Sequence, residues 1–160
     1  YILELKKLLS QLQPGYLPEP IFLEFTRLSV SAILELVPLR KNNVGQIEVL
    51  VLKRPEQDPH WPGMLHTPGT VLRPTDDNNL QSALERVLSE IGRKKEEYTF
   101  QKVDSFFHTV NRGKELAVVL TALIDNVTND DVWLPLTQIE GKVVETQIEF
   151  IQKSAKLLFK

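Results

Sequence analysis

The strongest constraint on the fold is a stretch in which a loop rich in proline and glycine runs directly into an amphipathic helix. The loop contains Pro62-Gly63 and Pro68-Gly69. Apolar residues at the spacing i, i+3, i+4 and i+7 predict the helix, and these are Leu80, Ala83, Leu84, Val87, Leu88 and Ile91. Gly92 follows the stripe and is typical of a helix C-terminus. One face of this helix must therefore cover a hydrophobic core.

Four longer apolar segments are predicted to be β-strands that form two antiparallel hairpins. The first hairpin joins Val30–Leu39 to Ile47–Leu52 through turn-forming residues. The second joins Phe100–Val110 to Glu115–Ile124 through a turn in which Gly113 suits a left-handed conformation. The charged run that precedes the second hairpin, residues 93–97, is predicted to have no regular structure.

A short strand and a second long helix are predicted near the end of the chain. The strand lies within Asp130–Leu136, and the helix is marked by Val144, Ile148, Ile151, Ala155 and Leu158. Strands interleaved with helices, and joined partly by hairpins, favour an α/β fold in which helices cover both faces of a mixed sheet.

The first residues are predicted to form a separate amphipathic helix, from about Ile2 to Gln13. Pro14-Gly15 ends it, and Leu17–Pro20 is predicted to be an extended connector. Residues 1–27 are thus interpreted as a helix with a Pro-rich connector, and residues 28–160 as the main domain. A lone helix of this length is marginal in water. Packing on its own domain is favoured over packing on a second copy, because it avoids the entropy lost on association.

Composition restricts the classes of function. With 160 residues, 42% hydrophobic and 25% charged, the chain is expected to form one globular domain. The net charge of −2 argues against sequence-independent nucleic-acid binding. The absence of cysteine excludes disulfides, thiolate catalysis and Cys-ligated metals. The sequence has no apolar run long enough to span a membrane, and a cytoplasmic location is expected.

The stretch from Trp61 to Gly92 resembles the Nudix box and the strand that leads into it. The family pattern runs through a PGxWxxPGG-like approach into G-x5-E-x7-R-E-U-x-E-E-x-G, where U is aliphatic. The matching residues here are Pro62-Gly63, Pro68-Gly69, Ala83, Val87, Glu90 and Gly92. The resemblance spans about Leu28 to Phe159. It implies a Nudix-like α/β/α sandwich with a mixed β-sheet, preceded by the N-terminal helix.

Most of the box carboxylates are replaced in this chain. The helical Arg-Glu pair is inverted to Glu85-Arg86, and the later Glu-Glu pair reads Ser89-Glu90. Hydrolysis of a diphosphate linkage needs hard divalent cations, usually Mg²⁺, which carboxylates hold. In the family the main metal ligands stand at the positions of Arg86, Ser89 and Glu90. The resemblance therefore implies a scaffold for a Mg²⁺-dependent pyrophosphohydrolase whose activity is weak or lost.

Candidate catalytic and metal-binding residues lie on the helix and in the loop before it. Glu90 and Glu85 are the candidate catalytic carboxylates, and Glu90 and Asp77 are the candidate ligands of Mg²⁺. Asp77 takes the place of the first box Glu, with one extra residue between it and Thr70. The alternatives are structural: Arg86 and Glu90 are four apart and could form an intrahelical ion pair, and Asp76-Asp77 suits helix capping.

Three further residues are candidates for substrate binding. His66 lies two residues before Pro68-Gly69, where the resemblance places the substrate, and Arg54 and Arg73 flank this region. A guanidinium group can hold a phosphate through two hydrogen bonds. A half-buried histidine bonded to the backbone, and solvated arginines, are the alternative interpretations.

Two functions remain open from the sequence. The first is hydrolysis of a nucleoside-diphosphate-linked substrate by Glu90 with compensating acids. The second is a Nudix-fold module that binds a nucleotide or a protein partner without turnover, which Arg86 and Ser89 favour. The replaced carboxylates favour weak or absent hydrolysis, and whether the chain is an enzyme stays open.

Overall fold

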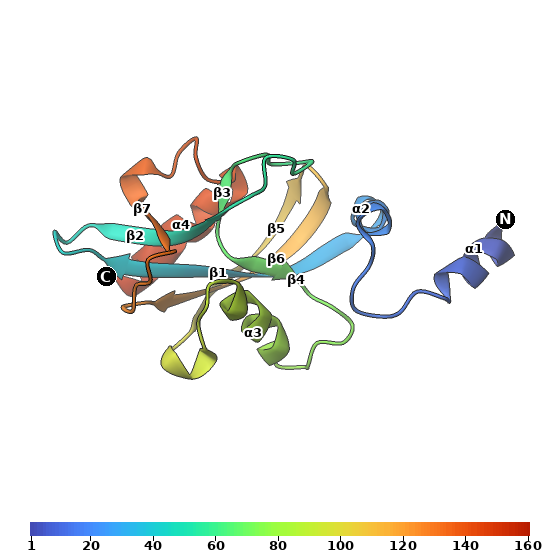
Figure 1. The fold of residues 1–160 in the computed structure, drawn as a ribbon, viewed down its shortest axis with the longest axis horizontal. Coiled ribbons are helices and arrows are strands. Elements are labelled where there is room, and N and C mark those ends of the chain that lie inside the picture. Colours follow the sequence, from blue (N-terminus) through green and yellow to red (C-terminus); the bar gives the residue numbers. More distant parts are fainter.

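The centre of the molecule is a seven-stranded mixed sheet, and the computed structural model describes all residues from 1 to 160 (Figure 1). The strands are β1 (Val30–Lys41), β2 (Ile47–Lys53), β3 (Leu65–His66), β4 (Gly69–Val71), β5 (Gln101–Val110), β6 (Gly113–Leu123) and β7 (Val132–Pro135). The strand order is β3-β2-β1-β6-β5, with β4 paired to β1 and β7 paired to β2. Both predicted hairpins, β1–β2 and β5–β6, are confirmed as antiparallel.

Parallel pairing of β1 with β6 joins the two hairpins. The pairing runs from Val30 opposite Lys114 to Leu39 opposite Leu123. Every other pairing of named strands in the sheet is antiparallel. The sheet is therefore mixed, as predicted.

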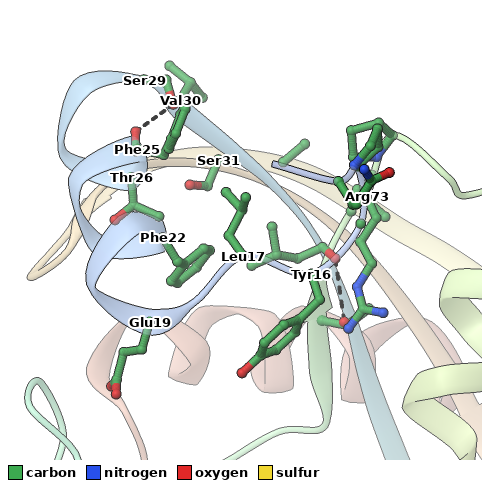
Figure 2. A pocket seen from close by; sticks show the side chains of 18 of the residues that line it. Tyr16, Leu17, Glu19, Phe22, Phe25, Thr26, Ser29, Val30, Ser31 and Arg73 are labelled. Carbon is green, nitrogen blue, oxygen red and sulfur yellow. Dashed lines mark hydrogen bonds between the residues drawn. The ribbon is translucent and has the colours of Figure 1, made fainter. Parts of the chain in front are cut away.

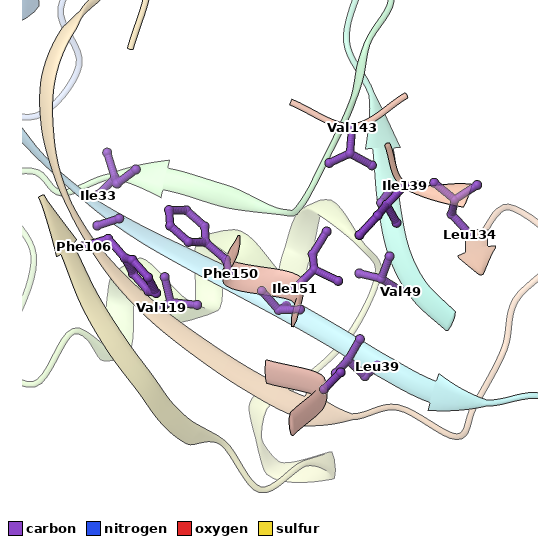
Figure 3. Close-up of a cluster of buried hydrophobic side chains, with 14 residues drawn as sticks. Ile33, Leu39, Val49, Phe106, Val119, Leu134, Ile139, Val143, Phe150 and Ile151 are labelled. Carbon is purple, nitrogen blue, oxygen red and sulfur yellow. The ribbon is translucent and has the colours of Figure 1, made fainter. Parts of the chain in front are cut away.

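Two helices cover the two faces of the sheet, α3 (Gln81–Glu90) on one side and α4 (Glu145–Leu158) on the other (Figure 1). Successive residues of β1 point to opposite faces. Thus Leu34 and Leu36 belong to the cluster under α3, whereas Ile33 and Val37 belong to the cluster under α4. In Figure 3, Phe150 and Ile151 of α4 lie among the side chains of the cluster under this helix. This is the predicted α/β/α sandwich.

The segment after α3 differs from its predicted lack of structure. Residues Lys95–Glu97 form a turn of 3-10 helix. The Arg93 side chain is only 2% exposed, and its Nη2 atom lies 2.6 Å from Oδ2 of Asp131. The same guanidinium donates to the carbonyl oxygen of Asn126 at 2.8 Å. Arg93, the first residue of the charged run, therefore connects the end of α3 to the loop before β7.

A helix that the sequence did not predict, α2 (Glu19–Leu28), packs on the ends of β1 and β6. Pro20 lies in its first turn, where a proline fits because the missing N–H would have no helical partner there. The predicted extended connector is thus wrong from Glu19 onward. The division of the chain into an N-terminal part, residues 1–27, and a main domain, residues 28–160, stays a prediction.

The helix α1 (Ile2–Leu9) extends away from the sheet (Figure 1). None of its residues is buried, and Ile2 and Leu3 are 84% and 82% exposed. The expectation that its leucine stripe packs on its own domain is therefore wrong. The connector around Pro14-Gly15 leads α1 away from the sheet. No helix of the protein is long and apolar enough to cross a membrane.

Deletion of residues 1–9 is expected to leave the melting temperature unchanged to within about 1 °C, because no buried apolar surface is lost. Thermal unfolding followed by circular dichroism would measure this. A fall of several degrees would mean that α1 packs on the domain in solution.

Gly113 is predicted to couple α2 to the β5–β6 turn. It has φ of +140°, and a Cβ atom at this position would lie 2.2 Å from the carbonyl oxygen of Thr26. We expect Gly113→Ala to lower the free energy of unfolding by about 2 kcal/mol or more. Gly45→Ala is the matched control, because Gly45 has φ of +81° but open space around it, and it should cost only about 1 kcal/mol. Urea unfolding of both variants compares them, and equal losses would contradict the steric argument.

Candidate functional site

The loop between β4 and α3 contains two adjacent aspartates, and the second of them caps the helix. Oδ1 of Asp77 accepts hydrogen bonds from the N–H groups of Asn79 at 3.0 Å and Gln81 at 2.8 Å. Its Oδ2 accepts from the N–H of Ser82 at 2.9 Å. These N–H donors hold the pKa of Asp77 below its usual value. The chain reverses at Leu80, which has φ of +59°, the only non-glycine residue with positive φ. The capping interpretation of Asp77 is therefore confirmed.

The first aspartate, Asp76, forms a two-point ion pair with Arg86. Nη2 of Arg86 donates to Oδ2 at 3.0 Å, and Nη1 donates to Oδ1. The Asp76 side chain is only 5% exposed, and the Arg86 guanidinium holds the pKa of Asp76 well below its usual range. The predicted ion pair between Arg86 and Glu90 is wrong. The loop places Asp76 above the second turn of α3, where it takes the guanidinium instead.

The remaining box positions lie at the surface of α3. Ser89 donates its hydroxyl hydrogen to the carbonyl oxygen of Arg86 at 2.8 Å. Glu85 is exposed and forms no ion pair. Glu90 is also exposed, yet partial burial of its carboxylate raises its pKa, which Arg86 opposes. The catalytic roles of Glu85 and Glu90 stay predictions.

These side chains do not fit the Mg²⁺ ion that the resemblance implies. No group of three or more His, Cys, Asp or Glu side chains lies close enough together to hold a metal ion. Of the three implied ligand positions only Glu90 carries a carboxylate. The oxygens of Asp77 are used by three backbone N–H groups, and those of Asp76 by a guanidinium.

A buried carboxylate that the sequence did not indicate lies on β1, opposite the first residue of β4. Glu35 of β1 is 7% exposed. Thr67 donates its hydroxyl hydrogen to Oε2 at 2.9 Å, and Gln147 of α4 donates to Oε1 at 3.2 Å. A Cβ atom at Gly69, the first residue of β4, would lie 2.6 Å from the Glu35 carboxylate, which would then have to shift. Burial raises the pKa of Glu35 to about 8, although these hydrogen bonds oppose the shift.

A second buried carboxylate, Glu115 of β6, lies near Glu35 and adds a smaller repulsive contribution to its raised pKa. Arg112 donates from Nε to Oε1 of Glu115 at 2.5 Å. The Nε2 atom of His108 lies 3.5 Å from Oε2 and makes no hydrogen bond. We call these residues the polar cluster: Glu35, Thr67, His108, Arg112, Glu115 and Gln147. All of them except Thr67 line part of a cavity of about 20 Å³, which has room for one water molecule.

The loop between β2 and β3 covers the polar cluster. Nη1 of Arg54 lies 2.7 Å from Oδ2 of Asp58, and the guanidinium lies 4.8 Å from the centre of the Trp61 ring. Arg112 lies 5.6 Å from the same ring centre. Burial alone would raise the pKa of Asp58, but the N–H groups of His60 and Trp61 together with Arg54 lower it to about 2. Arg54 is therefore paired with Asp58 and also lines the cavity at the polar cluster.

His66 stands next to the polar cluster on β3. It is half-buried, and its Nδ1 atom lies 2.8 Å from the carbonyl oxygen of Thr67. Burial lowers the pKa of His66 to about 4, and the nearby positive charge of Arg54 acts in the same direction. The imidazole is therefore neutral at pH 7 and bonded to the backbone, as the alternative interpretation describes. Its role in substrate binding stays a prediction.

Arg73 lies apart from Arg54 and His66, at the far end of β4. Its backbone N–H donates to Oδ2 of Asp76 at 2.7 Å, while its side chain lines a groove of about 920 Å³ (Figure 2). The three predicted substrate-binding residues are thus divided between two places. Arg54 and His66 are together beside the polar cluster, and Arg73 faces the groove.

Comparison with known proteins rests on structure alone. No protein-family model matches the sequence, and no curated protein matches it. The Nudix domain of Shewanella oneidensis NrtR complexed with ADP ribose matches with a TM-score of 0.67 at 19% identity, over 89% of this chain and 99% of that one. The Caenorhabditis elegans Ap4A hydrolase matches with a TM-score of 0.63 at 20% identity, over 81% and 99%. A MutT/Nudix family protein from Enterococcus faecalis matches with a TM-score of 0.60 at 16% identity, over 96% and 67%.

The chain has the Nudix fold. The architecture expected from the box resemblance is therefore confirmed, and α3 is the helix that contains the box-like residues Ala83, Val87 and Glu90. Identities of 20% or less concern the fold and leave the activity open.

Glu35 and Glu115 are the residues that sequence reasoning missed. The available signal was a carboxylate inside an apolar strand, as in Ala32-Ile33-Leu34-Glu35-Leu36. A charge on a strand that is buried on both faces must have partners. The sequence did not reveal which partners these are, because Thr67 and Gln147 are far away in the chain.

The raised pKa of Glu35 predicts a specific pH dependence of stability. The folded chain keeps a proton on Glu35 up to about pH 8, whereas the unfolded chain loses it near the ordinary value of 4.5. This contribution to stability is fully present below pH 4.5 and is lost as pH rises toward 8. Glu35→Gln should remove the loss, so that the variant gains on the wild type between pH 5 and 8 by an amount on the order of a few kcal/mol. Urea unfolding at several pH values measures it, and parallel curves for the two proteins would contradict the assignment.

Proposed function

We propose that this Nudix-fold chain binds a nucleotide-like small molecule and that its metal-dependent hydrolysis is weak or lost. The observation that carries the proposal is the two-point ion pair between Arg86 and the partly buried Asp76. It puts a fixed positive charge at a position where the box pattern has a metal-binding carboxylate. A divalent cation there would be repelled by the guanidinium.

Displacing Arg86 in favour of a metal is also unfavourable for Asp76. Its carboxylate is nearly inaccessible to water and receives two hydrogen bonds from the guanidinium. Breaking this pair leaves a partly buried carboxylate without its partner, which is unfavourable. The pair therefore opposes metal binding both by repulsion and by its own stability.

The proposed ligand class is supported by a structural neighbour and by the side chains beside β3 and β4. The NrtR domain was solved with ADP ribose. In this chain the neutral His66 and the charged Arg54 stand together. Buried nitrogen atoms without hydrogen-bond partners surround the same region, namely Arg54 Nε, His60 Nε2 and His108 Nε2. Buried polar atoms are normally satisfied, so these atoms favour a site that admits water or polar ligand groups.

Two other functions receive less support. Mg²⁺-dependent pyrophosphohydrolysis by Glu90 with Glu85 or Asp77 would require Asp77 to give up three capping hydrogen bonds. For a protein partner in place of a nucleotide, the support in the structure is the uncovered leucines of α1. NrtR was also solved with a 27mer DNA, but this chain covers 61% of that protein and carries a net charge of −2. The absence of nucleic-acid binding stays a prediction.

Restoring the box pattern tests the proposal. Glu85→Arg, Arg86→Glu and Ser89→Glu rebuild Arg-Glu-x-x-Glu-Glu, and Asp76→Asn in the same protein prevents repulsion between Asp76 and the new glutamate. With 5 mM Mn²⁺ we expect the melting temperature of the wild type to rise by less than about 1 °C, and that of the fourfold variant by about 5 °C or more. Release of nucleoside monophosphate from ADP ribose and Ap4A should be faster in the variant. Asp76→Asn alone is the control.

A wild type that is stabilised by Mn²⁺ and that hydrolyses these compounds faster than the fourfold variant would refute weak hydrolysis. Compensating carboxylates would then have to supply the metal site. The binding part of the proposal is tested separately, by titration calorimetry of the wild type with ADP ribose in EDTA.

A further inference from the structure

An open groove lies outside the polar cluster and is built partly by residues that precede the Nudix-like part of the chain. We call it the N-terminal groove (Figure 2). One side consists of residues 13–17 and one face of α2, and the other consists of residues 69–74, which include β4 and the segment that leads toward α3. Its floor is the beginning of β1. Its volume of about 920 Å³ lies within the range of small-molecule sites.

Two charged side chains stand at the groove without ion-pair partners. Arg73 and Glu19 both line it, and neither takes part in a salt bridge. Figure 2 shows them at opposite sides, with Tyr16 and Leu17 between them. The Arg73 backbone is fixed by its hydrogen bond to Asp76, which Arg86 holds in turn. A guanidinium on a fixed backbone is suited to a phosphate group.

Between these charges the groove presents aromatic rings. Tyr16 is 77% exposed and makes no aromatic or cation–π contact. Phe22 is half-buried, with Arg112 5.9 Å from its ring centre. An uncovered aromatic face next to a free cation is the combination that binds a base attached to a phosphate.

We propose that the N-terminal groove holds the nucleoside end of a nucleotide, with the base stacked on Tyr16, a phosphate on Arg73, and sugar hydroxyl groups donating to Glu19. The inference rests on the proposed function, and it assigns the nucleoside end of the ligand to the N-terminal groove and not to the polar cluster. Arg73 and Glu19 then each obtain a complementary partner. Leucine side chains, such as those of α1 from a second copy, would cover Tyr16 but leave the two charges unpaired, which is costly.

Titration calorimetry with ADP ribose and with ADP, using the full chain in EDTA, tests the proposal. Tyr16→Ala and Arg73→Ala should each weaken binding about tenfold or more, the size expected for one stacked base or one charged hydrogen-bonded contact. Tyr16→Phe keeps the ring and should bind as the wild type does. Inorganic pyrophosphate should lose affinity with Arg73→Ala but not with Tyr16→Ala.

Matched control variants separate the groove from general surface effects. Tyr1→Ala removes an exposed tyrosine from α1, and Arg27→Ala removes an exposed arginine from the far end of α2. Neither change should alter affinity. Melting temperatures of all variants should stay close to that of the wild type, because Tyr16 and Arg73 are not buried.

The failures of the two proposals are distinguishable. If the wild type binds neither compound, the proposed function fails and the groove assignment fails with it. If the wild type binds and both groove variants bind equally well, while Arg54→Ala binds weakly, the groove assignment alone is overturned. A dimer in light scattering that Tyr16→Ala dissociates would also overturn it, by assigning the groove to a second copy.

Discussion

Parallel pairing of β1 with β6 is the interaction on which the rest of this structure depends. It joins two hairpins that are each local in sequence, and it buries β1 on both faces. Once β1 is central, α3 and α4 have to cover opposite sides, because the apolar residues of β1 alternate between the two clusters. The same burial determines the electrostatics. Glu35 and Glu115 lie on these two strands, so their charges must be neutralised by protons, hydrogen bonds or arginines.

The charges of the box region are balanced in a different way from those of a metal site. In a metal-binding box, several negative groups gather around an external cation, and their repulsion is relieved only when it binds. Here the cation is a side chain of the same helix. Arg86 neutralises Asp76, Asp76 also accepts the N–H of Arg73, and Asp77 caps α3. The charges of this loop are thus largely balanced within the chain.

The sequence predicted the fold well because its main signals are local or periodic. Both hairpins, the helix stripes and the box resemblance depend on residues within short windows, and the structure confirms them. It predicted the contacts of charged residues poorly. Spacing along the helix predicts an ion pair between Arg86 and Glu90, but Arg86 pairs with Asp76 across a loop. Arg93 begins a charged run predicted to lack regular structure, but its side chain is buried against Asp131. Such partners are chosen by tertiary packing, which spacing along the chain does not encode. The helix α2 was missed because its two prolines flank or enter the first turn, where they are compatible with a helix.

The left-handed conformation of Leu80 has a consequence for how this loop tolerates change. A branched side chain at φ of +59° is strained by roughly 1–2 kcal/mol, and its contact with the cluster under α3 offsets that strain. Leu80 stands between Asp77 and α3, and with this conformation Asp77 accepts from the N–H groups of Gln81 and Ser82 while Asp76 reaches Arg86. Removing one residue there would move Asp76 off Arg86 and Asp77 off the helix start together. Loop length and charge balance are thus linked at this point, so that neither can vary without the other.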